Sequence, residues 1–402
     1  MRLSSDYCPI LDFGNRNSRA KEFHLTMPIL SQTHSPKHLS RWVILLMTVL
    51  VVGLLAACGT TTPTGETAAP VATAAAEEAE PIAVEPTAAP QIVATVAPAD
   101  AAAELPAQPA GGMPGGVMPG GGGDMPATTA TPVVKDAAYA TLSETQKLDL
   151  YLPEGEGPFP VVVSIHGGGF MMGDKADSMG TSGFDQLLAE GYAVAAVNYR
   201  LSGEATFPAA VEDVKAAVRW LRANAAAYNL NPDAIGAWGA SAGGNLVAML
   251  GTSCGATEVE GVDLGNADQS SCVQAVVDWF GPTDFLQMDT QFEGTDCPQT
   301  HDAADSPESA YLDAPIQDVP ELAAQANPIT YVTADAPPFL IQHGTADCNV
   351  PPQQSQLLYD ALTAAGAGAS LTLIDGAGHG GTQFWAADNW QMVVDFLNAS
   401  LK

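Results

Sequence analysis

Basic residues are scarce in this chain. Of its 402 residues, 14 are Lys or Arg against 45 Asp or Glu, which gives a formal net charge of −31. Six of the basic residues precede residue 42, so the rest of the chain is poorer still. No basic stripe is present to neutralise phosphates, and this argues against a nucleic-acid partner. The acidic excess is typical of a soluble surface.

Long hydrophobic runs are also lacking. The longest, Trp42–Ala57, is uncharged, but it is shorter than the roughly 20 residues that a transmembrane helix needs. Lys37 and Arg41 precede it, and small residues end it. A basic front, a short apolar middle and a small-residue end are the layout of a secretory signal. We interpret residues 1–57 as a signal segment with an N-terminal extension.

The end of this run resembles the lipobox of bacterial lipoproteins. It reads Leu55-Ala56-Ala57-Cys58. In that family the cysteine becomes the lipid-modified first residue of the mature protein. The resemblance implies lipid attachment at Cys58 and an extracytoplasmic protein anchored to the bacterial cell membrane. An uncleaved N-terminal anchor is the alternative, and it also places most of the chain outside the cytoplasm.

Four of the six cysteines remain when Cys58 is assigned to lipid and the first cysteine to the removed segment. An even number in an exported domain predicts two disulfides, for which three pairings are possible. We favour Cys254–Cys272, which would close a polar excursion, and Cys297–Cys348, which would tie an inserted loop to the rim of the site. A metal site is not favoured, because the chain has no C-x-x-C pair and no His-rich cluster.

Large apolar residues are sparse between residues 58 and 132. This segment consists mainly of Ala, Pro, Thr and Gly and includes the low-complexity stretch GGMPGGVMPGGGG. Such a composition cannot bury enough surface to offset the entropy lost on ordering. We predict a disordered tether over residues 58–132, followed by a folded domain over residues 133–402.

From residue 133 onward, short apolar runs alternate with helical patterns. This rhythm is typical of an α/β protein with helices on both faces of a mostly parallel central sheet. The unbroken apolar run at 160–166 predicts a buried strand. Apolar residues three or four positions apart predict an amphipathic helix over 207–228. Further strands are predicted over 148–152, 193–199, 235–239, 273–280, 338–343 and 370–374, and further helices over 242–250, 353–365 and 385–401.

One connection, over residues 281–337, is long for a link between two strands. Connections of this length are usually functional insertions. We predict that residues 283–337 form a small cap over the pocket.

Two glycine-rich patches follow predicted strands. The first, Gly239-Ala240-Ser241-Ala242-Gly243, places a serine where a strand turns sharply into a helix. Small neighbours suit this turn because its backbone is strained and crowded. The second patch, HGGGF at 166–170, offers free backbone N–H groups that can stabilise an oxyanion. Together they indicate a serine hydrolase with Ser241 as nucleophile and an oxyanion hole made by Gly168, Gly169 and Ala242.

A serine nucleophile needs an imidazole to take its proton and a carboxylate to fix the tautomer of that imidazole. In hydrolases with this turn the chain order is Ser, then Asp or Glu, then His. Asp347 follows the predicted strand that ends at His343, and His379 lies in a glycine-rich loop after the last strand. All three would lie at the carboxyl edge of the sheet, where α/β proteins bind ligands. We predict Ser241, Asp347 and His379 as the catalytic residues.

Other residues compete for parts of these roles. Asp284 also follows a strand and is the rival acid, although we favour Asp347. We interpret His166 as a residue that orients loop backbone and His343 as structural. His301 lies in the insertion, where we expect it to be exposed to solvent. We predict that Phe170 lines the pocket mouth and contacts substrate.

These motifs together resemble those of the α/β-hydrolases. The matching stretches are HGGGF, FPAAVEDVKAAVRWL, NPDAIGAWGASAGG, GPTD, PPFLIQHGTAD and GAGHGG. More narrowly, they resemble the bifunctional feruloyl and acetyl-xylan esterases and the lipase-like carboxylesterases. The resemblance covers most of residues 145–400. It implies an α/β-hydrolase fold, a triad of Ser241, Asp347 and His379, and an oxyanion role for the HGGG loop.

We therefore expect a surface-anchored serine carboxylesterase that forms an acyl-enzyme and needs no metal or organic cofactor. Its substrate would be a small-molecule or polysaccharide ester, with acetyl or feruloyl groups suggested by the resemblance alone. An amide or peptide hydrolase, formamidase-like or prolyl-oligopeptidase-like, is the first alternative. The second is a non-catalytic surface binding protein on a hydrolase fold, which the complete set of triad residues disfavours.

Overall fold

The computed structural model describes residues 128–177 and 181–402. The predicted signal segment, Cys58 and most of the predicted tether lie outside the described residues. The last residues assigned to the tether contact the folded domain. The Thr129 N–H donates to both carboxylate oxygens of Asp185 at 3.1 Å, and Ala130 N–H donates to the same carboxylate. Contacts with the domain therefore begin before the boundary predicted at residue 133.

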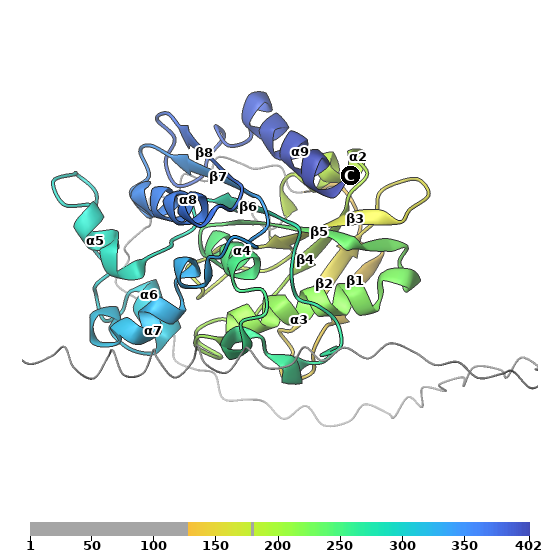
Figure 1. Cartoon of the computed structure of the whole chain (residues 1–402), viewed down its shortest axis with the longest axis horizontal. Helices are drawn as coiled ribbons and strands as arrows, with labels where there is room; N and C mark the ends of the chain where they lie inside the picture. Colours follow the sequence, from red (N-terminus) through yellow and green to blue (C-terminus); the bar gives the residue numbers. More distant parts are fainter. Residues whose placement is uncertain (1–127, 178–180) are drawn as a thin grey trace, which may run out of the picture. The chain divides into compact units, whose positions relative to one another are not determined.

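A single eight-stranded sheet organises the described residues, with the order β1-β2-β4-β3-β5-β6-β7-β8 (Figure 1). β2 pairs antiparallel with β1 and β4, and the other neighbours pair in parallel. The sheet is therefore mostly parallel, as predicted. Its strands are β1 (Val134–Ala138), β2 (Lys147–Tyr151), β3 (Phe159–Ile165), β4 (Ala193–Val197), β5 (Leu230–Ala240), β6 (Ala275–Trp279), β7 (Phe339–Gly344) and β8 (Ala369–Ile374).

The central strands are apolar on both sides because both faces of the sheet are covered. Val161 and Val163 of β3 belong to one core cluster, whereas Val162 belongs to the other. Successive side chains of a strand point to opposite faces, so an unbroken valine run serves both cores. All five residues of β4 are buried.

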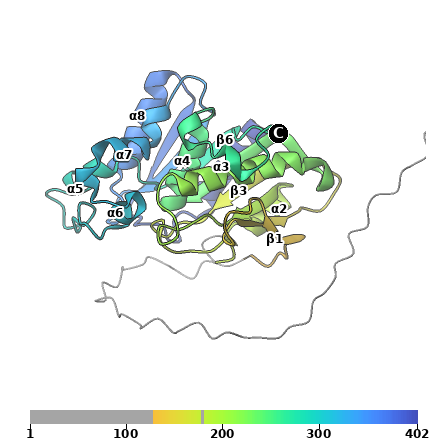
Figure 2. The ribbon, with the colours of Figure 1, turned by 90° about the horizontal axis from the view of Figure 1, so that it is seen from below.

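Helices cover the two faces (Figure 1, and Figure 2 from below). On one side, α3 (Ala209–Ala223), α4 (Ala242–Thr252) and α8 (Gln353–Ala365) contribute to the larger core cluster. On the other, α2 (Phe184–Ala189) and α9 (Ala387–Leu401) contribute to the smaller one. The α3 helix begins after Pro208 and ends before Asn224, so it is shorter than the helix predicted over residues 207–228.

The long connection between β6 and β7 folds into short helices. They are α5 (Met288–Gln291), α6 (Pro307–Leu312) and α7 (Pro320–Gln325). At the start of α6, Ser306 Oγ accepts from the Ser309 N–H at 3.0 Å, as a capping serine does. Tyr311 of α6 is fully buried and anchors the insertion to the domain core.

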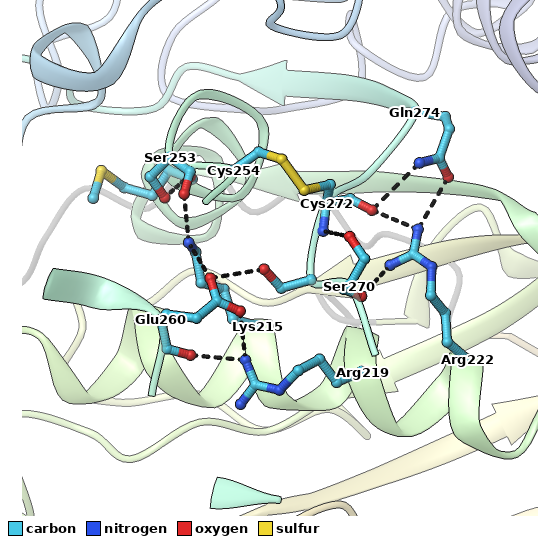
Figure 3. Close-up of a disulfide and its surroundings, with 11 residues drawn as sticks. Lys215, Arg219, Arg222, Ser253, Cys254, Glu260, Ser270, Cys272 and Gln274 are labelled. Atoms are coloured by element: carbon cyan, nitrogen blue, oxygen red, sulfur yellow. Dashed lines mark hydrogen bonds and ion pairs between the residues drawn. A yellow bond between two sulfur atoms is a disulfide. The ribbon is translucent and has the colours of Figure 1, made fainter. Parts of the chain in front are cut away.

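Both expected disulfides are present. Cys254–Cys272 closes the polar segment that follows α4, and α3 supplies the cations that line this segment (Figure 3). Lys215 Nζ donates to Glu260 at 2.9 Å, and Arg222 donates to the Cys272 carbonyl at 2.5 Å. The second disulfide, Cys297–Cys348, joins the insertion to the loop after β7. The predicted pairing is therefore confirmed.

Candidate active site

Ser241 stands at the sharp turn between β5 and α4. Its φ of 59° and ψ of −125° are unusual for a residue with a side chain and indicate local strain. The neighbouring glycines permit the turn. A Cβ at Gly239 would lie 2.3 Å from the Gly243 carbonyl oxygen, and one at Gly243 would lie 2.2 Å from the Ile165 carbonyl oxygen. Close approach of α4 to β3 and β5 therefore requires glycine at both positions.

The structure brings Ser241, His379 and Asp347 together at the carboxyl edge of the sheet. His379 Nε2 lies 2.9 Å from Ser241 Oγ, and His379 Nδ1 lies 2.7 Å from Asp347 Oδ2. An ionised carboxylate only accepts hydrogen bonds, so Nδ1 carries the proton and Nε2 accepts from the serine hydroxyl. The imidazole is thereby held in the tautomer that can remove the serine proton.

Asp347 is almost fully buried, and hydrogen-bond donors surround its carboxylate. Its Oδ1 accepts from the N–H groups of Asn349 and Val350 at 2.8 and 3.0 Å. Burial alone would raise the pKa of Asp347, but the hydrogen bonds from His343 and His379 hold that pKa well below its ordinary range. The carboxylate is therefore ionised at neutral pH.

His343 contributes a second imidazole to this carboxylate. It is fully buried, and its Nε2 lies 2.9 Å from the Val350 carbonyl oxygen and 3.3 Å from Asp347 Oδ2. Both neighbours are acceptors, so Nε2 carries the proton and Nδ1 accepts from the Ser355 hydroxyl at 2.7 Å. The interpretation of His343 as structural missed its contact with Asp347. The sequence signal for this contact was the four-residue spacing between His343 and Asp347 in the motif HGTAD.

Phe280 was also missed, although it packs against the catalytic histidine. Its ring centroid lies 4.6 Å from that of His379, and its backbone has a positive φ of 44°. The same ring approaches Gly380, where a Cβ would lie 3.5 Å from Phe280 Cζ. Phe280 therefore supports both the histidine and its loop. Nothing in the sequence marks this role, because it depends on backbone conformation at the end of β6.

The HGGG loop lies directly against the serine. A Cβ at Gly167 would lie 3.3 Å from Ser241 Cβ. His166 is buried and stacks on Tyr199 with ring centroids 4.5 Å apart. Burial lowers the pKa of His166 and favours the neutral ring. Its Nδ1 lies 2.8 Å from the Gly167 carbonyl oxygen, an acceptor, so Nδ1 carries the proton and donates to it. His166 thus orients loop backbone, as interpreted.

The predicted oxyanion donors belong to this loop and to α4. Gly168 and Gly169 have φ values of +113° and +59°, which favour glycine. Ala242 is the first residue of α4, so its N–H has no acceptor within the helix. The two segments flank Ser241. Negative charge would develop on the carbonyl oxygen of a substrate attacked by this serine, and hydrogen-bond donors are required beside that oxygen.

Comparison with known proteins supports the same classification. The BD-FAE family model matches residues 148–362, more than half of the chain. The chain belongs to the BD-FAE family. Among solved structures, a truncated carbohydrate esterase from gut microbiota is 32% identical with a TM-score of 0.61, covering 68% of this chain and 97% of that one. This member of the BD-FAE family has the α/β-hydrolase fold.

Two further relatives are similar over part of their length. The bifunctional GH43-CE protein of Bacteroides eggerthii is 35% identical with a TM-score of 0.60, covering 67% of this chain and 35% of that one. Esterase LipC of Mycobacterium tuberculosis is 31% identical over 236 residues, covering 56% of each chain. The chain spans about half the length of the curated relatives it matches.

In this BD-FAE family member Phe170 does not line the pocket mouth, and that prediction was wrong. Its side chain is 1% exposed and stacks on Tyr311 of the insertion with ring centroids 4.0 Å apart. A positive φ of 60° and the aromatic partner from α6 account for the inward position. Met171 and Met172 are the exposed residues of this loop.

The exposure predicted for His301 was also wrong. It is 9% exposed, and its Nδ1 lies 3.1 Å from Glu308 Oε2. Burial alone would lower the pKa of His301, but the adjacent Glu308 carboxylate outweighs burial and raises it. The rival acid, Asp284, accepts from the Leu286 N–H at 3.2 Å and caps a short turn. The structure thus places Asp347, and not Asp284, against His379.

Proposed function

We propose that this chain is a serine carboxylesterase that hydrolyses small acyl esters through an acyl-enzyme. The observation that carries the proposal is the 2.9 Å contact between His379 Nε2 and Ser241 Oγ, with Asp347 2.7 Å behind the imidazole. A serine hydroxyl with a base at this distance, and a base oriented by a buried carboxylate, is arranged for nucleophilic attack.

In the first half-reaction Ser241 Oγ attacks the ester carbonyl carbon while His379 Nε2 takes the hydroxyl proton. Ionised Asp347 stabilises the imidazolium that forms. The carbonyl oxygen becomes an oxyanion, which we assign to the N–H groups of Gly168, Gly169 and Ala242. One such donor lowers the barrier by about 2.7–4 kcal/mol. The C–O bond to the alcohol then breaks, and the alcohol oxygen takes the proton from His379.

In the second half-reaction a water molecule attacks the acyl-enzyme. His379 removes a proton from this water, a second tetrahedral oxyanion forms, and the bond between the acyl carbon and Ser241 Oγ breaks. The serine oxygen recovers its proton from His379, and the carboxylic acid leaves. No external oxidant or reductant is required, because the sequence of steps is a hydrolysis.

We further propose acetyl or feruloyl groups on polysaccharide as the substrate class. The support is similarity to a protein named as a carbohydrate esterase and to the carbohydrate-esterase-containing GH43-CE protein. Curated relatives named as esterases favour ester over amide substrates and favour a catalyst over a non-catalytic binding protein.

Activity of the full chain on p-nitrophenyl acetate tests the mechanism. We expect Ser241→Ala to lose at least roughly 1,000-fold in kcat, the scale seen when a triad nucleophile is removed. Comparable rates from the wild type and the variant would refute it. A panel of acetylated xylan, methyl ferulate and an aryl amide then assigns the substrate class, and faster turnover of the amide would favour the amide hydrolase.

We also propose that Cys58 carries a lipid that anchors the enzyme outside the cytoplasm of a bacterium. The support is the apolar run before Cys58 and the presence of two disulfides, which persist in oxidising compartments. In the described part of the chain, no helix has the length and apolar character to cross a membrane. Palmitate labelling should be lost in Cys58→Ala, and retained label would contradict the anchor.

A further inference from the structure

A hollow of about 480 Å³ lies between the insertion and the loop that carries Asp347. We refer to it as the side hollow. Residues of the segment 291–297 line one wall, and residues between Thr345 and the start of α8 line the facing wall. The Cys297–Cys348 disulfide joins the two walls. This covalent link limits how far the two walls can separate.

The described lining contains a single charged residue, which is unusual in a chain of net charge −31. Among the described residues that line it, Asp347 alone is charged, and its carboxylate is already occupied by His379 and backbone amides. The remaining polar groups are amides and hydroxyls, and the remaining surface is apolar. The polar lining residues are Gln291, Thr295, Thr345, Gln353 and Gln356, and the apolar ones include Phe292, Pro352 and Leu373.

Several of these polar groups have hydrogen-bond donors or acceptors that are not used within the described part of the chain. The side-chain carbonyl oxygen of Gln291 accepts a hydrogen bond from Gln354, so the NH₂ group of Gln291 remains available to a ligand. The NH₂ group of Gln356 donates to Asp360, so the side-chain carbonyl oxygen of Gln356 remains available to a ligand. Within residues 128–177 and 181–402, the exposed Gln353 side chain has no hydrogen-bond partner. The side hollow therefore presents both donors and acceptors that carry no charge.

An apolar surface accompanies these amides. Leu373 near the end of β8 is 48% exposed, and it is one of the few large apolar residues exposed in the described chain. Neutral amides beside an apolar surface match a sugar ring, which has hydroxyl groups around its edge and C–H groups on its faces. A charged ligand would find no partner of opposite sign here, since the carboxylate of Asp347 is buried.

The side hollow opens on the same edge of the sheet as the nucleophile. Thr345 and Asp347 follow β7, Leu373 lies one residue before the end of β8, and Ser241 follows β5, which is parallel to both. His379 contacts Ser241 on one side and Asp347 on the other. An ester bound at Ser241 and a ligand in the side hollow would therefore lie on the same edge of the sheet, with His379 and Asp347 between them.

We propose that the side hollow is a saccharide subsite that binds a sugar unit next to the one carrying the ester. This assignment rests on the proposed function, because it places the ester of a saccharide at Ser241. Binding energy from a remote unit can raise kcat/KM for the polymer without affecting a small ester that cannot reach the subsite.

The kinetic test uses the double variant Gln353→Ala/Gln356→Ala in the full chain. Gln391→Ala is the matched control, because Gln391 is also an exposed helical glutamine that donates to an aspartate four residues on, at 2.9 Å. We expect the double variant to lose roughly ten-fold in kcat/KM on acetylated xylohexaose, mainly through KM, with p-nitrophenyl acetate unchanged. The control should match the wild type on both. Equal losses on the two esters, or no loss on the oligosaccharide, would overturn the subsite.

A binding measurement separates failure of the subsite from failure of the proposed function. Titration of the Ser241→Ala chain with unacetylated xylohexaose, cellohexaose and mannohexaose requires no turnover. We expect one of them to bind, and to bind roughly ten-fold more weakly when Gln353→Ala/Gln356→Ala is added. Absence of binding by all three, or binding that the added changes leave intact, overturns the subsite. Absence of wild-type activity on p-nitrophenyl acetate would instead refute the esterase.

Discussion

His343 Nε2 lies 3.3 Å from Asp347 Oδ2, the same oxygen that accepts from His379 at 2.7 Å. One carboxylate oxygen therefore faces two imidazoles, while the other accepts two backbone N–H groups. His343 has no room to turn, because Ser355 and the Val350 carbonyl fix its two nitrogens. It acts through Asp347, as a positioning residue.

Replacing His343 should reduce activity even if the protein folds. Hydrogen bonds to charged groups contribute about 1.5–3 kcal/mol, so we expect His343→Leu to lose roughly 10- to 100-fold in kcat on p-nitrophenyl acetate. His343→Gln keeps a donor that can reach Asp347 and should recover part of the loss. If both variants were folded by circular dichroism and had the wild-type kcat, the positioning role would be excluded.

The depressed pKa of Asp347 makes a prediction about acid stability. Because this pKa is lower in the folded chain than in the unfolded chain, ionised Asp347 contributes stability above the unfolded value of about 3.9. That contribution declines as pH falls below about 4 toward the folded pKa. Asp347→Asn should therefore be more destabilising at pH 7 than at pH 3, measured as the free energy of unfolding in urea.

A difference between the two proteins removes the contributions of groups that do not contact Asp347. Asp278, whose pKa burial raises to about 6, titrates in the wild type and in the variant alike. A difference in unfolding free energy that is the same at pH 7 and pH 3 would show that Asp347 is not stabilised in its ionised form.

The two disulfides should differ in their effect on catalysis. Cys297–Cys348 spans 51 positions and Cys254–Cys272 spans 18, so chain entropy predicts stabilisation of about 4 and about 3 kcal/mol. Cys348 directly follows Asp347, whereas the other bridge closes a segment beside α3. We expect Cys297→Ser/Cys348→Ser to lower both stability and kcat, and Cys254→Ser/Cys272→Ser to lower stability alone.

Thermal unfolding and p-nitrophenyl acetate kinetics on the two double variants provide the measurement. Both must be assayed well below their melting temperatures, so that loss of folded protein does not resemble loss of kcat. Equal retention of kcat by the two variants would mean that the loop carrying Asp347 is held by its own hydrogen bonds alone.

Sequence reasoning located the sheet and the three residues at its edge because those features are local. β3 is apolar except for Ser164, and the glycines at Gly239 and Gly243 mark the turn at Ser241 within a few residues of sequence. Each candidate residue lies on the segment that follows a strand, and parallel strands end at the same edge. The order of motifs along the chain was therefore sufficient to bring distant residues together.

Features that depend on distant partners were not predictable. Phe170 and His301 are buried because Tyr311 and Glu308, both on α6, lie against them. No periodicity in the sequence predicts that α6 packs against Phe170 or His301. Two elements outside the insertion were missed for another reason. β1 has an irregular register and mostly exposed residues, and the six-residue α2 begins without a side-chain cap.

The last prediction concerns the loop beside the nucleophile. A Cβ at Gly167 would lie 2.8 Å from the Ala240 carbonyl oxygen and 3.3 Å from Ser241 Cβ, so Gly167→Ala must push the loop away from the serine. We expect kcat to fall by roughly 100-fold, because the donors assigned to Gly168 and Gly169 would move with the loop. Gly203→Ala is the control, since its Cβ would meet nothing within 4 Å. Retention of wild-type kcat by a folded Gly167→Ala variant would exclude this loop from stabilising the oxyanion.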